Sequence, residues 1–220
     1  GGGSGTLTLP NQNQLTGDRG LIATNGGEVQ LTANNNYTGP TVVSDYAFSS
    51  RTTQAIADTT SGISTALFAP TVLTVTSLKS GGLASSIGTS SDDAANLVIQ
   101  GSTLRHIGAG DKVNRLFTIG SRGATIETVG LTRAFFGNSG TIAIQPAGAS
   151  TTRTLTLRSD SLVNSMSPVI PDAADGGIVA LVKDGPGNWT LFGNNSYSGP
   201  THVRAGELEI NGIQTGTGET

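Results

Sequence analysis

The sequence contains no cysteine among its 220 residues, and tryptophan and methionine occur once each. Without a thiol, the chain can form no disulfide, no cysteine nucleophile and no thiolate metal site. Charge is also scarce, because Asp, Glu, Lys and Arg make up 12% of the chain, about half of the usual share, and the net charge is -3. Strong nucleic-acid binding is therefore not expected, since no basic stripe is present.

Good helix formers and long apolar runs are also rare. Lysine occurs three times, whereas Gly, Thr, Ser and Asn occur 32, 31, 22 and 14 times. No run of about 18 apolar residues is present, so we expect no helix that spans a membrane. We interpret the opening Gly-Gly-Gly-Ser-Gly of residues 1–5 as a linker, a cloning scar or a cut in a longer chain, and residues 6–220 as one domain.

What the sequence has in their place is short alternation of apolar and polar residues. Alternation turns every second side chain to one face, which is typical of half-buried strands. Turn residues in each gap favour an all-β sandwich, barrel or solenoid. The clearest runs are residues 6–9, 72–76, 97–99, 141–144, 154–157 and 206–210.

Helix is expected only as a minor component. Residues 91–96 are predicted to form one helical turn with Ser91 as its N-cap, because Asp92 and Asp93 would face the positive end of the helix dipole. The weakly patterned residues 49–64 are compatible with a short helix or with a surface excursion, and the sequence leaves both open.

A repeat is visible near the two ends of the chain. Residues 27–43 align with residues 187–203 without a gap, and nine of the 17 positions are identical. We interpret the unit as strand, corner, strand: Asn tolerates left-handed backbone at the corner and bonds its own turn, Tyr covers it, and Gly-Pro makes a second turn. The positions assigned to the repeat are Gly27, Leu31, Asn34, Asn35, Tyr37, Gly39, Pro40, Thr41, Val43, Gly187, Trp189, Leu191, Asn194, Asn195, Tyr197, Gly199, Pro200, Thr201, Val203, Gly206 and Leu208.

Repeats of strands with turn chemistry between them favour a stacked, quasi-one-dimensional β-structure. We predict a right-handed parallel β-helix, a solenoid with short excursions. Each coil would use roughly 20–25 residues, which gives about nine or ten coils. Leu, Val and Ile would point inward, and Thr, Ser and Arg would point outward.

Residues 181–212 resemble the autotransporter-associated β-strand repeat. The resemblance is carried by Lys183, Gly185, Gly187 and Trp189 and, further on, by the Asn-x-Tyr-x-Gly-x-Thr-x-Val and Gly-x-Leu steps. Residues 27–48 resemble a partial copy, which ends in Ser-Asp-Tyr-Ala-Phe where the family has an Ala-Gly-x-Leu step. The resemblance implies a right-handed β-helical passenger stem, exported and then displayed on the bacterial surface or released from it, with further β-helical segments or identical subunits as partners.

Pairs of carboxylates are the first candidates for catalysis, because some β-helices cleave polysaccharides and two acids must converge for that reaction. A solvated outer face is the favoured interpretation of Glu207 with Glu209, and a helix start is that of Asp92 with Asp93. The loop at residues 172–177 could also bind calcium weakly, although its spacing is not that of a known loop. The pairs are Asp92 with Asp93, Asp172 with Asp175, and Glu207 with Glu209.

Histidine and arginine provide few further candidates. His106 and His202 are the two imidazoles, too few for a zinc site made of histidine alone, and no Gly-x-Ser-x-Gly elbow occurs. A polysaccharide-cleaving enzyme would need a carboxylate or arginine cluster on one outer face. The loose candidates for that cluster are Arg105, Arg115 and Arg122.

The aromatic residues leave two interpretations. Trp189, Tyr37 and Tyr197 would bind carbohydrate if they lay exposed in a row. Alternatively, each Tyr packs over its own Asn-Asn corner, which is the interpretation we favour.

These observations predict a non-catalytic extracellular module, a β-helical stalk that serves adhesion or surface display and uses no cofactor. A host or matrix surface is the expected partner, and nucleic acid is not. One alternative is a subunit of an extracellular filament, joined end to end through the open edges of the β-helix. The other is a polysaccharide-cleaving β-helix enzyme.

Overall fold

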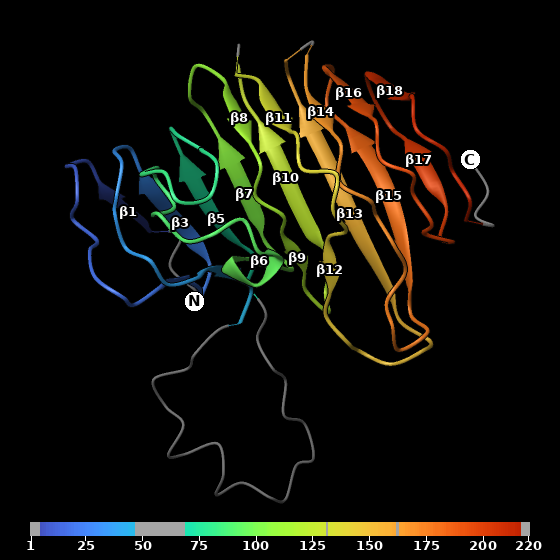
Figure 1. Ribbon diagram of the computed structural model, residues 1–220, viewed down its shortest axis with the longest axis horizontal. Coiled ribbons are helices and arrows are strands. Elements are labelled where there is room, and N and C mark those ends of the chain that lie inside the picture. The colour runs from blue at the N-terminus through green and yellow to red at the C-terminus, as the bar shows by residue number, and fades with distance from the viewer. Residues whose placement is uncertain (1–4, 47–68, 131, 162, 217–220) are drawn as a thin grey trace, which may run out of the picture.

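The protein consists of parallel β-strands arranged in three sheets (Figure 1). A computed structural model describes residues 5–46, 69–130, 132–161 and 163–216. Every registered strand pair among them is parallel. In the same residues, the one helix is a single 3₁₀ turn, η1 at Ala94–Asn96. The prediction of an all-β protein is therefore confirmed, and the parallel sheets are consistent with a β-helix.

We call the sheets the large, the second and the third sheet. The large sheet contains, in spatial order, β1 (Thr6–Leu9), β3 (Gly27–Leu31), β5 (Thr71–Val75), β7 (Thr103–His106), β10 (Ala124–Thr128), β13 (Thr152–Ser159), β15 (Ile178–Asp184) and β17 (Thr201–Val203). The second sheet contains β18 (Glu207–Ile210), β16 (Asn188–Leu191), β14 (Ser165–Met166), β11 (Ala134–Phe136) and β8 (Asp111–Val113). The third sheet contains β12 (Ala143–Ile144), β9 (Thr118–Ile119), β6 (Leu97–Gln100), β4 (Thr41–Ser44) and β2 (Leu21–Ala23).

The chain returns to the large sheet after it has passed through one or both of the other sheets. It passes, for example, from β7 through β8 of the second sheet and β9 of the third before it reaches β10. Each return adds one strand beside the last, so the strands of the large sheet follow one another along the long axis from β1 to β17 (Figure 1). Residues far apart in sequence thus become register partners on one face.

Aliphatic side chains from all three sheets fill the interior. On the large sheet, the inward row runs through Leu73, Leu104, Ile126 and Leu157, which are register partners and fully buried. Removal of such side chains from water is the main stabilising contribution to a fold of this kind. The outward neighbours of this row are mostly Thr and charged residues, as strand alternation requires.

The circuits vary in length more than the sequence predicted. The interval from Leu181 to its register partner Thr201 agrees with the prediction, whereas the interval from Gly27 to its partner Thr71 is far longer. The long interval contains residues 47–68, so the excursion or helix predicted at 49–64 lies outside the described residues. With eight strands in the large sheet, the described part makes fewer circuits than the nine or ten predicted, because several circuits are longer than expected.

Two local predictions are wrong. The N-cap of η1 is Asp93 rather than Ser91, since the carboxylate Oδ1 of Asp93 accepts a hydrogen bond from the Ala95 N–H at 2.9 Å. The Asn-Asn corners of the repeats do not use left-handed backbone, because the described non-glycine residues with positive φ are Asn13 and Asn25. The corner asparagines act through their side chains instead.

Arginine is not confined to outward positions as predicted. Arg115 and Arg153 are fully buried, together with Lys183. Arg115 lies in a loop, and Arg153 and Lys183 lie near the ends of β13 and β15. Arg153 pairs with Asp175, whereas Lys183 donates from Nζ to the carbonyls of Asp184, Gly185 and Ala205 at 2.7–3.0 Å. Burial lowers the pKa of the Lys183 ammonium, and the three carbonyls offset part of the cost of removing its charge from water.

Candidate functional site

The two repeat units make the same local contacts at opposite ends of the molecule, although their strands lie in different sheets: β3 and β4 in the large and third sheets, β16 and β17 in the second and large sheets. In both, the Asn side-chain oxygen accepts a backbone N–H of the preceding circuit at 3.0 Å: Asn35 from Leu15, and Asn195 from Ile170. The carbonyls of Pro40 and Pro200 also accept equivalent bonds, from Leu21 N–H at 2.9 Å and Leu181 N–H at 3.0 Å. The repeated residues thus join one circuit to the next.

The repeat tyrosines are buried over these corners. Tyr37 Oη lies 2.6 Å from Thr41 Oγ1, and Tyr197 Oη lies 2.8 Å from Thr201 Oγ1. Both rings are almost fully buried, as is Trp189, and burial raises the pKa of Tyr37 to about 12. A sugar-binding row made of these three aromatic residues is therefore excluded, because none of them faces solvent.

The remaining repeat positions lie on strands or in the turns between them. Leu31, Val43 and Leu191 are buried in the core, whereas Val203 is half exposed on β17. The repeat glycines lie where circuits approach closely, so a Cβ at Gly39 or Gly199 would overlap the backbone of the neighbouring circuit. The positions distributed in this way are Gly27, Asn34, Gly39, Thr41, Gly187, Asn194, Gly199, Gly206 and Leu208.

The carboxylate pairs proposed for catalysis are used in turns and strand pairing. Asp172 accepts hydrogen bonds from the backbone of Val179 and Ser198, at 2.8 and 3.0 Å. The backbone N–H groups of Gly148 and Ala147 lower the pKa of Asp175 to about 2. Glu207 and Glu209 accept hydrogen bonds from Asn188 Nδ2 and Thr190 Oγ1 of β16, at 2.8 and 3.1 Å.

Arg105, Arg115 and Arg122 are not brought together. Arg115 is buried in a turn, Arg122 pairs with Asp45, and Arg105 lies on the outer face of the large sheet. Among the described residues, no group of three or more His, Asp or Glu side chains could hold a metal ion. His202 is exposed on β17, in register with Val182.

His106 is buried at the end of β7, beside the first residue of β8. Its Nε2 lies 3.0 Å from Asp111 Oδ2, an oxygen that also accepts the Leu78 N–H at 2.6 Å. Burial lowers the pKa of His106, although Asp111 and a hydrogen bond to the Thr76 backbone oppose the shift. His106 is therefore uncharged in the folded protein near neutral pH.

We expect this histidine to make the fold sensitive to acid. Its pKa is near 6.5 in the unfolded chain and lower in the folded protein, so its neutral form is favoured by folding. The free energy of unfolding should be independent of this group above pH 6.5 and should decrease as the pH falls below it. Urea unfolding between pH 7.5 and 5.5 measures the effect. His106→Gln should flatten the dependence, whereas His202→Gln should leave it; an unchanged slope in His106→Gln would contradict the assignment.

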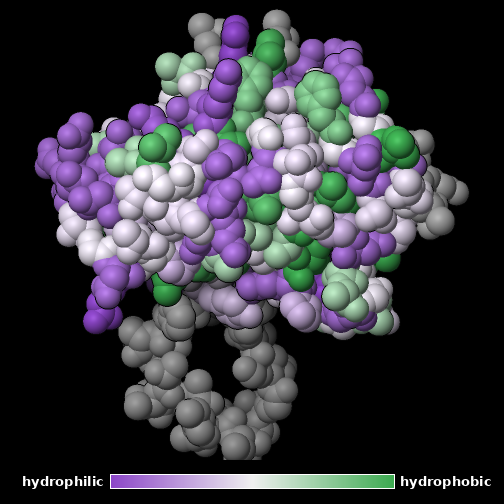
Figure 2. Space-filling model, viewed as in Figure 1, coloured by the Kyte–Doolittle hydropathy of each residue, from purple (hydrophilic) through white to green (hydrophobic). Residues whose placement is uncertain are grey.

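A row of alternating charge crosses the outer face of the large sheet. Register partners on β7, β10, β13 and β15 are Arg105, Glu127, Arg158 and Asp184, which we call the charged row. Arg105 Nε lies 2.6 Å from Glu127 Oε2, and Arg158 Nε lies 3.8 and 3.6 Å from the carboxylates of Glu127 and Asp184. Figure 2 shows hydrophilic and intermediate residues over much of this face, with hydrophobic residues scattered among them.

A groove of about 450 Å³ lies beside the charged row, and we call it the sheet groove. One side consists of Gln30, Thr74, Arg105 and Glu127, which are successive register partners on β3, β5, β7 and β10. The other side is formed by Ile107 and Val129, and the carboxylates of Glu28 and Asp160 complete the lining. Arg105 was among the candidates from the sequence, but its partners were not, because they come from strands at unequal spacings.

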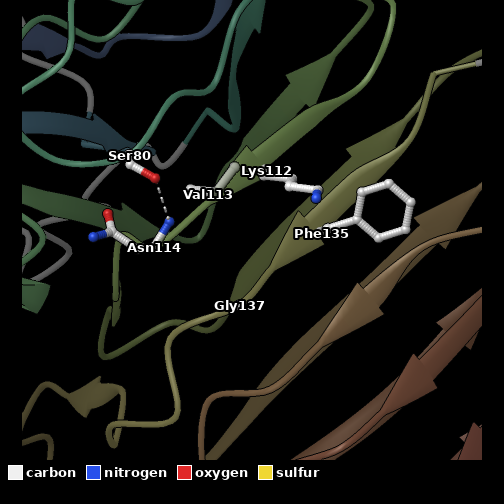
Figure 3. Close-up of a pocket in the computed structure, with 6 residues that line it drawn as sticks. All are labelled: Ser80, Lys112, Val113, Asn114, Phe135 and Gly137. Carbon is white, nitrogen blue, oxygen red and sulfur yellow. Dashed lines mark hydrogen bonds between the residues drawn. The ribbon is translucent and has the colours of Figure 1, made fainter.

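A second hollow, of about 330 Å³, lies on the second sheet. Figure 3 shows Lys112 and Phe135 extending side by side from β8 and β11, where they are register partners. Ser80 and Asn114 line the same hollow, but they bind each other: the Asn114 N–H donates to Ser80 Oγ at 3.2 Å. Asn114 Oδ1 also accepts the Gly81 N–H at 2.8 Å. The polar groups of this hollow therefore hold the segment at residues 77–92.

Comparison with known proteins agrees with the repeat geometry. Residues 21–45 and 181–210 match the family described as passenger-associated-transport-repeat, and these residues overlap the two units described above. The chain carries the repeat of autotransporter passengers. No solved structure matches the chain.

One relative extends the likeness of this passenger-repeat chain beyond the two units. The chain is 42% identical over 148 residues, 66% of its length, to the protein named adhesin BmaC autotransporter of Brucella suis biovar 1 (strain 1330). It spans 4% of that protein's length. Of the residues that the structure describes, none forms a helix long and apolar enough to cross a membrane.

Proposed function

We propose that this chain is a non-catalytic segment of a surface-displayed passenger, a right-handed β-helical stem that contributes to adhesion. The observation that carries the proposal is the pair of repeat units, which make the same inter-circuit hydrogen bonds within parallel sheets. The family description and the name of the related adhesin support a place at the cell surface. Further β-helical segments and a host or matrix surface are its expected partners.

The physical basis of the stem is the exchange of hydrogen bonds between successive circuits. Each strand of the large sheet is paired with the strand one circuit earlier, and the turn asparagines, Arg115 and Lys183 add side-chain bonds to carbonyls or N–H groups. In a structure of this kind each layer is stabilised mainly by its neighbours. Such a rod can hold a binding face at a distance from the cell without a catalytic group.

The chain, placed as the passenger of an exported autotransporter, should test the proposal. We expect cells that carry it to expose the chain to external antibody and to adhere to host or matrix surfaces more strongly than cells with an unrelated passenger of equal length. Antibody binding measures display, and counts of attached cells measure adhesion. A chain that is displayed and folded but leaves adhesion unchanged would contradict the adhesive role, and depolymerisation of an added polysaccharide would favour an enzyme instead.

A further inference from the structure

We propose that the sheet groove binds a linear, uncharged glycan, laid along the long axis of the large sheet. The inference deepens the adhesive role proposed above and rests on it for its biological meaning. It is carried by the two unlike sides of the groove, which run in the same direction across the strands.

The polar side has one polar side chain on each strand, and of these Gln30 and Arg105 are open to a ligand, because Thr74 is 2% and Glu127 9% exposed. Gln30, Thr74, Arg105 and Glu127 follow one another in register, so an amide, a hydroxyl, a guanidinium and a carboxylate recur at the inter-strand spacing of about 4.8 Å. Sugar hydroxyls both donate and accept hydrogen bonds, as protein hydroxyls do. The Gln30 amide, which donates and accepts, and the Arg105 guanidinium, which donates, lie two strands apart and can therefore bind hydroxyls of a chain that lies across the strands.

The opposite side is apolar. Ile107 and Val129 directly follow β7 and β10 and continue their pairing, since Ile107 N–H donates to the Val75 carbonyl at 2.9 Å and Val129 N–H to the His106 carbonyl at 3.1 Å. Ile107 is 42% exposed. The C–H face of a sugar ring can pack on these two side chains while its hydroxyls reach the polar side, so a pyranose presents the two surfaces that the groove requires.

The charges of the groove argue against a polyanion. Its lining includes three carboxylates, those of Glu28, Glu127 and Asp160, and one guanidinium, that of Arg105. Uronate or sulfate groups would meet a net negative charge there, and like charges that approach closely cost several kcal/mol. An uncharged glycan avoids this repulsion.

The backbone beneath the groove argues against a peptide. An extended peptide binds most strongly by adding a strand to a sheet edge, where backbone N–H and C=O groups are unpaired. Strands β3, β5, β7 and β10 lie within the large sheet, paired with a strand on each side. The groove therefore offers side chains rather than backbone groups.

The polar groups are already fixed in position before a ligand arrives. Arg105 Nη1 lies 3.4 Å from Glu28 Oε1, Arg105 Nε lies 2.6 Å from Glu127 Oε2, and Thr74 Oγ1 donates to Glu28. Of the five N–H donors of a guanidinium, these pairs use Nε and Nη1. Because the side chains are held in place, little additional ordering is required on binding.

Binding can be tested with the purified 220-residue chain and short oligosaccharides. Saturation-transfer NMR and calorimetry would compare neutral glycans with uronate and sulfated glycans of equal length. We expect neutral glycans to bind, Ile107→Asp to weaken binding by at least roughly tenfold, and Ile107→Trp to strengthen it severalfold. The matched control is Ile22→Asp, which changes a 65% exposed isoleucine of the third sheet and should leave the affinity unchanged.

Four results would overturn the proposal: no neutral glycan bound at millimolar concentration, tighter binding of the anionic glycans, equal effects of Ile107→Asp and Ile22→Asp, or self-association of the chain that Ile107→Asp abolishes. The last would assign the groove to a second copy of the chain. Display and adhesion are measured on cells and binding on the purified chain, so failure of the glycan proposal is distinguishable from failure of the adhesive role.

Discussion

Replacement of Arg115 by Met should lower the free energy of unfolding by about 3 kcal/mol, because buried acceptors left without a donor cost about 1–3 kcal/mol. Arg115 is 1% exposed. Its Nε donates to the Lys79 carbonyl at 2.8 Å, Nη1 to the Ser90 carbonyl at 2.7 Å, and Nη2 to the Gly88 carbonyl at 3.1 Å. Met retains an unbranched apolar stem but leaves these buried acceptors without a donor.

The loss should be concentrated in one part of the molecule. Arg115 binds carbonyls on both limbs of the segment at residues 77–92, so its removal should raise hydrogen exchange there more than in β13 and β15. Urea unfolding and amide exchange measure the two effects. The control is Arg204→Met, an exposed arginine after β17 whose replacement should change the free energy of unfolding by less than about 0.5 kcal/mol. Equal losses in the two variants would show that Arg115 does not stabilise the turn.

The burial of these cations could have been predicted from which residues of each alternating run share a face. Arg115 is in phase with the buried Phe117 and Ile119, and Arg153 is in phase with Leu155 and Leu157. Alternation therefore assigns both arginines to the inward face. The expectation that arginine points outward followed the average behaviour of the residue rather than the phase. The better rule is that a cation in phase with core residues is buried and takes its partners from a neighbouring turn, which are carbonyls for Arg115 and the Asp175 carboxylate for Arg153.

Strand positions were predictable for the same reason. The alternating runs at residues 6–9, 72–76, 97–99 and 206–210 overlap β1, β5, β6 and β18. Each of these strands can be recognised from its own residues and the turn residues beside it. Register was not predictable, because the intervals between register partners of the large sheet are unequal, short from Leu181 to Thr201 and long from Gly27 to Thr71. No fixed period aligns such strands.

The candidate groove shows the consequence of that limit. Thr74, Arg105 and Glu127 lie far apart and at unequal intervals in the sequence, yet they are neighbours on the sheet. No spacing rule in the sequence brings them together. The repeat corners, in contrast, consist of residues close in sequence, and their Asn-x-Tyr-x-Gly-Pro-Thr pattern could be read directly from the two copies. The left-handed backbone considered for the corner is nevertheless absent. The asparagine side chains accept hydrogen bonds from the preceding circuit and do not act only within their own turn.

Replacement of Gly187 by Ala should be among the most damaging single-methyl changes in this chain. Gly187 N–H donates to the Ser159 carbonyl at 2.7 Å, and a Cβ at this position would overlap the Ser161 carbonyl and lie 2.7 Å from the Ser161 nitrogen. On the other side, Gly206 packs against the Gly187 carbonyl so closely that a Cβ there would overlap it as well. Three successive circuits therefore approach one another at a point where only glycine fits.

Relief of that overlap would require the circuits to separate. We expect Gly187→Ala to lower the free energy of unfolding by about 3 kcal/mol, at the upper end of the cost of overpacking, and to increase hydrogen exchange in β16 and β18. Gly137→Ala is the matched control, since a Cβ at Gly137 meets no atom within 4 Å, and it should change stability by less than about 1 kcal/mol. Equal midpoints of urea unfolding for the two variants would show that close approach of the circuits at Gly187 does not limit the fold. On cells, the two variants distinguish a loss of folded chain from a loss of ligand binding. Gly187→Ala should reduce the amount of folded chain that is displayed, whereas neither alanine changes the side chains of the sheet groove.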